Sequence, residues 1–233
     1  MSEVVEESVE TGIGASVRRR EDLRFITGRG RYTDDINQSG QVHAVFCRSP
    51  YARAKISSIE FLDAMQTPGV VACYSGEAML KDEIGDLPCG WMVKSKDGSD
   101  MLSAPHPPLA VSHVNYAGEP FAIVIAESLS AARHGADAVL VDFEELNPIV
   151  DLGTAAQSEQ IYEGIDNNTA YQWALGDEEA TRTAFAKASH VTTLELKNNR
   201  LIPNAIEPRA CLGMFEPATS DYTLYTTSQN PHL

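Results

Sequence analysis

The side chains best suited to nucleophilic or metal chemistry are widely separated in this sequence. Its four cysteines, Cys47, Cys73, Cys89 and Cys211, lie 26, 16 and 122 positions apart. With no short-spaced pair, neither a disulfide framework nor the close cysteine spacing of an iron–sulfur cluster is indicated. Cys47 also lies in a strand-like run, which favours a packed thiol over a catalytic one. We therefore expect reduced, mostly buried cysteines.

Two histidines form the other candidate pair. His106 and His113 are seven positions apart, a spacing that would place them on one face of a helix. The neighbouring Pro105, Pro107 and Pro108 exclude a helix there, and no cysteine or carboxylate pattern surrounds the two rings. The sequence therefore predicts no metal site at these histidines.

The common catalytic and nucleotide-binding motifs are missing. The G-x-G at residues 28–30 lacks the third glycine of a dinucleotide fingerprint and follows no strong strand, so it indicates a turn. The sequence contains no G-x-x-x-x-G-K-[ST] phosphate loop, no G-x-S-x-G elbow and no H-E-x-x-H helix. These absences argue against the usual nucleotide-binding, hydrolase and zinc-protease classes.

Basic residues are concentrated near the N-terminus of an acidic chain. The sequence has 18 Lys and Arg against 33 Asp and Glu, a net charge of −15, which argues against nucleic acid and anionic membranes as partners. One cluster contains Arg18, Arg19, Arg20, Arg24, Arg29 and Arg31. One interpretation is that these side chains pair with nearby acids, and each exposed pair then contributes less than about 1 kcal/mol. The other is that they form a subunit contact or bind a carboxylate or phosphate group. Both interpretations remain open.

Hydrophobic patterning predicts an α+β fold. The 233 residues are 43% hydrophobic, enough for a substantial core. Strands are expected at residues 42–48, 54–60, 70–74, 109–116, 121–127 and 139–144, and short helices at 61–65, 76–81 and 130–138. Residues 121–126 show no polar alternation, so we expect both faces of that strand to be covered.

The rest of the chain has weaker signals. Residues 82–108 are expected to form a long surface excursion. Later elements are a helix at 176–188, a strand at 191–197 and an antiparallel pair at 210–215 and 221–227. Three strands and one helix do not easily close a core, so this second domain looks unfinished. With no signal sequence and no apolar run near 20 residues, we expect a cytoplasmic protein without a membrane span.

Seven segments, taken in order, resemble one enzyme family. They are RRREDLRF (18–25), TGRGRY (27–32), DDI (34–36), FCRSPYA (46–52), YAGEP (116–120), NAIEPR (204–209) and TSQNP (227–231). In this order and spacing they resemble the molybdenum-binding large subunit of the xanthine dehydrogenase, aldehyde oxidase and aerobic carbon monoxide dehydrogenase family. The resemblance covers residues 14–233, and no one segment would suffice for it.

The resemblance implies four regions within an α+β chain. These are a flexible acidic arm at 1–15, an α/β hammerhead domain at 16–150, a connector at 151–169 and the incomplete start of a molybdopterin-binding domain at 170–233. Large subunits of the family continue for several hundred residues more. We therefore expect a truncation or the product of a split gene, inactive by itself.

The resemblance also implies the chemistry. In the family, a molybdenum–pterin cofactor and a glutamate base late in the subunit hydroxylate an electron-poor carbon, that of an aldehyde, an N-heterocycle or carbon monoxide, with water-derived oxygen. Gln229 matches the glutamine whose amide hydrogen-bonds an oxygen ligand of molybdenum; the other interpretation is that it only caps a turn. Glu207 and Arg209 are expected to hold strand ends near the site. No catalytic residue and no metal ligand is expected within the chain itself.

The expected partners follow from what the chain lacks. In the family, electrons pass to [2Fe-2S] clusters and to a flavin, FAD, and the cysteine spacing here places both on partner subunits. The partners would be the remainder of the large subunit, an iron–sulfur subunit, a flavin subunit and a small-molecule substrate. One alternative is a non-catalytic hammerhead-type assembly or interaction module without cofactor. Another is a small enzyme that uses Cys47 or the histidines.

Overall fold

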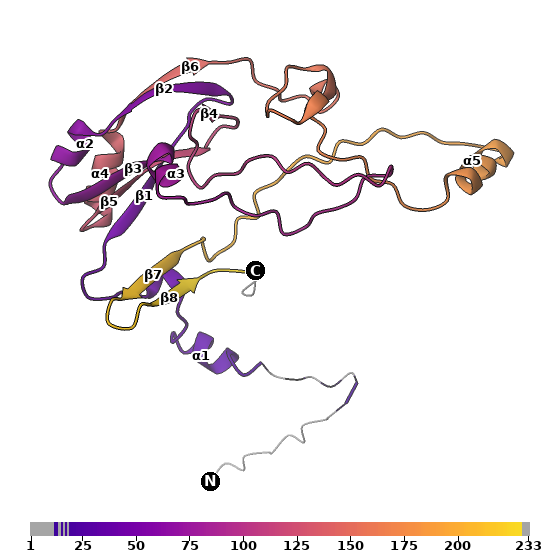
Figure 1. Ribbon diagram of the computed structural model, residues 1–233. Coiled ribbons are helices and arrows are strands. Elements are labelled where there is room, and N and C mark those ends of the chain that lie inside the picture. The colour runs from indigo at the N-terminus through magenta and orange to yellow at the C-terminus, as the bar shows by residue number, and fades with distance from the viewer. Residues whose placement is uncertain (1–11, 14, 16, 18, 230–233) are drawn as a thin grey trace, which may run out of the picture. The chain divides into compact units, whose positions relative to one another are not determined.

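The chain forms two compact units. The computed structural model describes residues 12–13, 15, 17 and 19–229, so most of the arm predicted at 1–15 lies outside the described residues. Unit 1 comprises Met1–Ser39 and Lys197–Leu233, and unit 2 comprises Gly40–Leu196 (Figure 1). These units are defined by contacts and do not follow the boundaries expected near residues 150 and 170, which stay a prediction.

Unit 2 contains two antiparallel sheets of three strands each. The first has the order β1-β5-β3 and the second the order β4-β2-β6. The strands are β1 (His43–Arg48), β2 (Ala54–Glu60), β3 (Val70–Ser75), β4 (His113–Val114), β5 (Pro120–Ala126) and β6 (Leu140–Glu145). Five of the six predicted strands are therefore confirmed within one or two residues.

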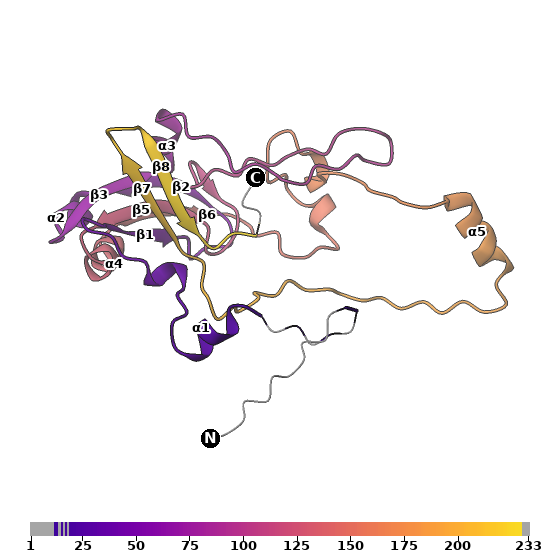
Figure 2. The same cartoon turned by 90° about the horizontal axis from the view of Figure 1, so that it is seen from below.

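Helices cover one face of the first sheet. The helices of unit 2 are α2 (Leu62–Gln66), α3 (Gly76–Lys81), α4 (Leu129–Asp137) and α5 (Glu178–Lys187). The α4 helix packs on β1 and β5, and Ser128 caps its N-terminus by accepting a hydrogen bond from the Ala131 N–H (Figure 2). Gly135 permits the close approach, because a Cβ there would lie 2.6 Å from Val70 and 3.0 Å from Val124.

The opposite face of the first sheet is less covered than the sequence predicts. Ala122, Val124 and Ala126 are fully buried beneath the helices. On the other face the half-buried Ile123 lies in register between Phe46 and Tyr74, whose exposures are 44% and 42%. Phe121 is the exception on that face, with an exposure of 4%, so the prediction that both faces of residues 121–126 are covered holds throughout the helix-covered face and only at Phe121 on the other. The lack of polar alternation indicated an apolar strand, and local sequence contains no information about what lies above each face.

An aromatic cluster joins the second sheet to the core. The Phe143 ring lies edge-on to both Tyr51 and Phe121, with ring centroids 5.4 Å apart in each case. The fully buried Ala54 and Val114 pack in the same cluster. Cross-strand and cross-sheet contacts of this kind make unit 2 a packed domain with its own core.

The predicted strand at 109–116 is mostly wrong. Only β4 forms, because Leu109 and Ala110 run across the start of α3 as buried loop. A Cβ at Gly76 would lie 2.4 Å from the Ala110 carbonyl oxygen, so the two backbones touch there. The surface excursion expected at 82–108 is confirmed: it is irregular apart from one bridge between Lys94 and Asp100.

Residues 171–206 are exposed along their whole length. Within this segment α5 begins after the Asp177 cap, close to the predicted start, and is flanked on both sides by extended chain (Figure 1). The strand predicted at 191–197 is wrong for the described chain: these residues form no ladder with another described strand, although Leu194 and Leu196 alternate as a strand would.

Unit 1 combines the two ends of the chain. Its elements are α1 (Asp22–Ile26), a 3-10 turn η1 (Thr33–Asp35) and the hairpin of β7 (Cys211–Glu216) with β8 (Asp221–Thr226). The hairpin confirms the predicted antiparallel pair, with Cys211 opposite Thr226 at its base. The α1 helix was not predicted from the residues of this segment. Among the residues that the structure describes, no helix is both long and apolar enough to span a bilayer.

Candidate functional site

The predicted cofactor residue lies just beyond the base of the β7–β8 hairpin. Thr227 closes that base: its backbone N–H donates to the Ala210 carbonyl, and its Oγ1 accepts from the Ala210 N–H, at 3.2 Å each. Gln229 follows two residues later as an exposed bend. Its side-chain amide has no hydrogen bond to another described residue. The structure therefore places Gln229 next to a fixed hairpin, and its role at a cofactor stays a prediction.

Glu207 is a structural residue of unit 1. Its Oε1 accepts a hydrogen bond from the backbone N–H of Thr33 at 3.0 Å, across 174 positions of sequence. That bond fixes η1, whose own cap is the Asp35 carboxylate accepting from the Tyr32 N–H at 2.8 Å. The structure gives Glu207 a role at η1, and the expectation that it holds a strand end near the site stays a prediction. The role expected of Arg209 stays a prediction.

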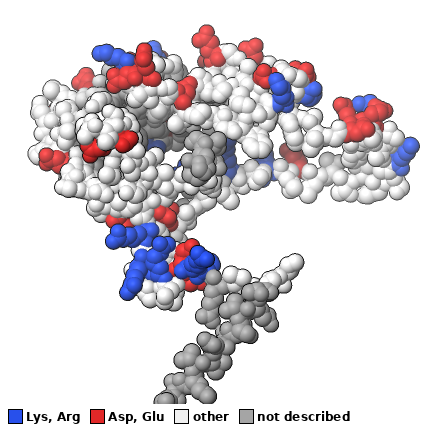
Figure 3. All heavy atoms as spheres, turned by 60° about the horizontal axis from the view of Figure 1, so that its bottom comes forward, with Lys and Arg blue, Asp and Glu red and all other residues white. Residues whose placement is uncertain are grey.

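The N-terminal arginines lie on the surface. Arg19 pairs with Asp22 at 3.0 Å, and the Arg24 guanidinium lies 5.0 Å from the Phe25 ring centre. Figure 3 shows blue side chains gathered in the lower part of the view, above the grey residues. These exposed contacts contribute less than about 1 kcal/mol each. Arg18 lies outside the described residues, and both interpretations of the cluster remain open.

The buried thiols are unsuited to nucleophilic catalysis. Burial raises the pKa of Cys47 to about 11, with smaller contributions from Cys73 and Asp137. Its Sγ lies 3.8 Å from the Ala136 carbonyl, beneath α4. Burial also raises the pKa of Cys73. A thiol so rarely ionised at neutral pH is a packing residue, which argues against an enzyme that uses Cys47.

The two candidate histidines do not join a larger ligand set. His113 lies in β4 with Nδ1 3.0 Å from the Ser112 hydroxyl, and His106 lies in the irregular excursion. Within the described part of the chain, no group of three or more His, Cys, Asp or Glu side chains could hold a metal ion.

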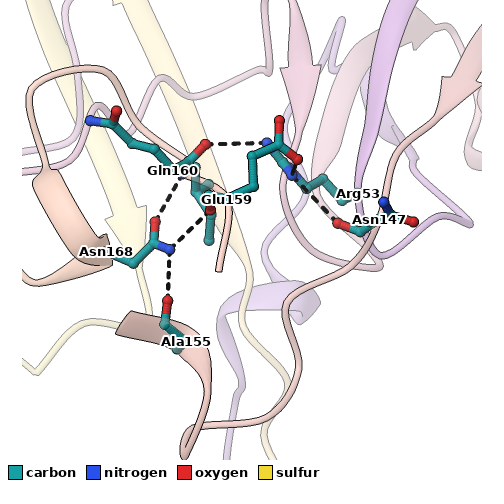
Figure 4. A network of polar contacts seen from close by, with 7 residues as sticks. Arg53, Asn147, Ala155, Glu159, Gln160 and Asn168 are labelled. Atoms are coloured by element: carbon teal, nitrogen blue, oxygen red, sulfur yellow. Dashed lines mark hydrogen bonds and ion pairs between the residues drawn. The ribbon is translucent and has the colours of Figure 1, made fainter. Parts of the chain in front are cut away.

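Sequence reasoning missed a buried arginine network in unit 2. The Arg53 side chain is 8% exposed and its Nη1 donates to the Glu159 carboxylate at 2.9 Å (Figure 4). It also donates to the carbonyls of Asn147 and Gln160, at 3.4 and 3.3 Å. Its Nε is buried without a hydrogen-bond partner in the described structure. These bonds hold the segment expected to be a connector against the end of β2.

Asn168 completes that network. Its amide donates to the carbonyls of Ala155 and Glu159, at 2.9 and 3.0 Å, and accepts from the Ile161 N–H at 2.8 Å (Figure 4). The backbone of Asn168 is left-handed, with φ of 49°, a conformation that asparagine tolerates better than most residues. The segment is therefore ordered by specific polar contacts, which a composition rich in Thr, Ala, Gln and Ser did not reveal.

Unit 2 also contains a cavity that the sequence did not predict. Its volume is about 710 Å³, and α3, the 105–115 loop and residues 160–163 line it. Glu119, 7% exposed, is one lining residue, and its carboxylate accepts from the Asn115 N–H. Burial raises the pKa of Glu119, against the lowering effect of the backbone N–H groups of Asn115 and Tyr116. Burial and the Glu119 charge raise the pKa of Tyr162.

Comparison with known proteins provides independent evidence. Residues 27–147 match the family model "Aldehyde oxidase and xanthine dehydrogenase, a/b hammerhead domain", and residues 161–233 match "Molybdopterin cofactor-binding domain". The nicotine 6-hydroxylase large subunit of Paenarthrobacter nicotinovorans is 33% identical over 94% of this chain and 26% of its own length. The carbon monoxide dehydrogenase large chain of Hydrogenophaga pseudoflava is 30% identical over 92% of this chain and 27% of its own.

A solved structure agrees with these relatives. The quinoline 2-oxidoreductase structure from Pseudomonas putida 86 superposes with a TM-score of 0.74 at 30% identity, over 91% of this chain and 26% of that one. The chain thus spans about a quarter of the length of the relatives that it matches.

Proposed function

Because the chain belongs to the aldehyde oxidase and xanthine dehydrogenase family of molybdenum hydroxylases, we propose that it forms the hammerhead and first cofactor-binding part of a large subunit. The assembled enzyme would oxidise an electron-poor carbon, that of an aldehyde, an N-heterocycle or carbon monoxide, with water-derived oxygen. The observation that carries this proposal is the order of the two family matches, hammerhead at 27–147 and cofactor-binding domain at 161–233.

Gln229 fits the molybdenum–pterin cofactor. It is a neutral amide, exposed and without a described partner, at the end of a hairpin fixed by Thr227. A neutral donor can hydrogen-bond an oxygen of the cofactor without adding charge to the metal site. When bound, the cofactor would supply the oxidation of the carbon and the transfer of oxygen to it. Holding that cofactor oxygen is the role that we assign to Gln229.

The uncovered apolar residues support a chain that needs more protein around it. Residues 171–206 expose ten large hydrophobic side chains: Tyr171, Trp173, Leu175, Phe185, Val191, Leu194, Leu196, Leu201, Ile202 and Ile206. So many exposed apolar side chains within one segment are typical of a region that other protein covers. We assign that cover to the remainder of the large subunit, and the iron–sulfur clusters and FAD to separate subunits. A cytoplasmic location remains a prediction from the sequence.

The decisive experiment analyses the complex that copurifies with this chain. The proposal expects stoichiometric molybdenum and pterin, together with iron and flavin from the partner subunits. Copurification of neither molybdenum nor pterin from cells that make active molybdenum enzymes would overturn it and would favour the non-catalytic assembly module.

A further inference from the structure

The cavity in unit 2 has the size and walls of a small-molecule site. Its volume of about 710 Å³ falls within the usual range for ligand pockets, roughly 300–1,000 Å³. Met79 and Leu80 of α3, Ile84, Ile161 and three prolines form an apolar part of a mixed wall. That part accommodates a hydrocarbon body.

A small group of polar side chains converges at one part of the wall. Glu119, Asn115 and Tyr162 all line the cavity. The Asn115 backbone N–H donates to the Glu119 carboxylate, and the Asn115 side chain lowers the pKa of Tyr162. A carboxylate can accept more hydrogen bonds than its backbone donors supply here, so Glu119 has acceptor capacity left for another donor.

The charges around the cavity favour a cation. Three lining residues are acidic, Asp86, Glu119 and Glu163, and among the described lining residues the only Lys or Arg is Arg53. The guanidinium of Arg53 is already paired with Glu159 at 2.9 Å. The charge of His106 also lowers the pKa of Glu119, but His106 is not among the residues that line the cavity. Burial destabilises the carboxylate, and a cation bound inside the cavity relieves that cost.

We propose that this cavity binds a small organic amine in its protonated form, with the ammonium group at the Glu119 carboxylate and the hydrocarbon body against α3 and the prolines. Tyr162 lines the same cavity, and its pKa is raised by the Glu119 charge, so its hydroxyl is a second polar group near the proposed ammonium site. A divalent metal does not fit, because no group of three candidate ligands forms among the described residues.

The test is a charge series on the purified 233-residue chain. Benzylamine, benzyl alcohol and benzoate have similar shapes and are cationic, neutral and anionic at pH 7. Calorimetric titration should give the order benzylamine, then benzyl alcohol, then benzoate, with benzylamine at least about tenfold tighter than the alcohol. Benzoate binding as tightly as benzylamine would overturn the proposal and would make Arg53 the anchor. Absence of benzylamine binding up to about 10 mM would overturn it as well.

Variants locate the ammonium group. Glu119→Gln keeps an acceptor for the Asn115 N–H but removes the charge, and should weaken benzylamine at least about tenfold while leaving benzyl alcohol unchanged. Tyr162→Phe keeps the ring and should cost less, about two- to fivefold. Glu144→Gln, an exposed carboxylate of β6 outside the cavity, is the matched control and should change nothing. If Glu119→Gln folds and binds benzylamine as tightly as the parent chain, Glu119 is not the ammonium site and the proposal is overturned. If Glu119→Gln does not fold, the charge series on the parent chain decides the proposal.

Discussion

The packed core of unit 2 and the exposed segment at 171–206, most of which belongs to the same unit, differ in how their apolar residues are used. In unit 2, Phe121, Val124 and Leu109 are at most 4% exposed, and helices, sheets and an aromatic cluster enclose them. In the segment, Leu194 and Leu196 are 75% and 78% exposed despite the alternation of a strand. The difference is one between a closed hydrophobic core and a segment whose apolar side chains are exposed.

The largest expected effect is on activity. The chain purified alone should show no hydroxylation of aldehydes or N-heterocycles and no oxidation of carbon monoxide, because it spans about a quarter of the length of the relatives that it matches and, in our proposal, other protein supplies the rest of the site. Steady-state assays with an artificial electron acceptor would check this, with the copurified complex as positive control. Turnover by the isolated chain would contradict the proposal that the active enzyme needs protein beyond this chain.

Next in size is a packing effect at Gly76. A Cβ there would lie 2.4 Å from the Ala110 carbonyl oxygen and 2.7 Å from that of Leu109, and backbone atoms cannot rotate away. Gly76→Ala should lower the free energy of unfolding by about 3 kcal/mol. Gly213→Ala is the control, because a Cβ at Gly213 meets nothing within 4 Å and should change stability by less than about 0.5 kcal/mol. Urea denaturation measures the free energy of unfolding of both variants. Equal losses in Gly76→Ala and Gly213→Ala would contradict the expected difference between the two positions.

The reactivity of each cysteine should follow its burial. With a pKa of about 11, Cys47 is ionised to only about one part in a thousand at pH 8. It should react with iodoacetamide at least about a hundredfold more slowly than the exposed Cys89, and its rate should rise with pH up to about 11. Peptide mass spectrometry of partly alkylated native protein gives both rates. A fast Cys47 would mean that β1 opens to solvent.

Two arginines sharpen the comparison further. Arg53 makes its contacts while 8% exposed, whereas Arg182 pairs with Glu178 and Glu179 on α5 while 64% exposed. Arg53→Ala should cost about 2 kcal/mol of unfolding free energy, because two carbonyls and a carboxylate lose a buried donor. Arg182→Ala should cost less than about 1 kcal/mol. Thermal denaturation of both variants checks the difference, and similar losses would show that the Arg53 network contributes no more than a surface pair.

The smallest expected effect concerns Gln229, in the exposed bend that follows β8. Gln229→Ala should leave the melting temperature unchanged and slow turnover of the assembled enzyme by about tenfold or more, the loss of one well-placed hydrogen bond. Gln229→Glu is an informative companion, because it keeps the shape and adds charge. Equal rates for parent and Gln229→Ala would leave Gln229 as a turn residue only.

Local signals account for most of the secondary structure. The strands of unit 2 follow β-rich runs, α4 begins after the Ser128 cap, and the hairpin at residues 211–226 follows its turn. The exceptions have physical reasons. Residues 109–111 are apolar because they are buried loop against Gly76, and the strand pattern of 191–197 has no partner among the described residues.

The site residues divide in a similar way. Gln229 came from segment resemblance, since no spacing rule marks a lone glutamine. Arg53, Glu119 and Asn168 could not be predicted as interacting residues, because their partners lie far away in the sequence or belong to backbone groups. Arg53 and Glu159, for example, are 106 positions apart.

The sequence by itself determined the elements, the acidic charge, the absence of common catalytic motifs and the resemblance to one enzyme family. These are properties of neighbouring residues and of the order of short segments. Only the tertiary structure decided which face of the first sheet is buried, that Glu207 holds Thr33, and that Glu119 and Tyr162 share one cavity. Such pairings join residues that no local pattern relates, because they depend on how the whole chain folds back on itself.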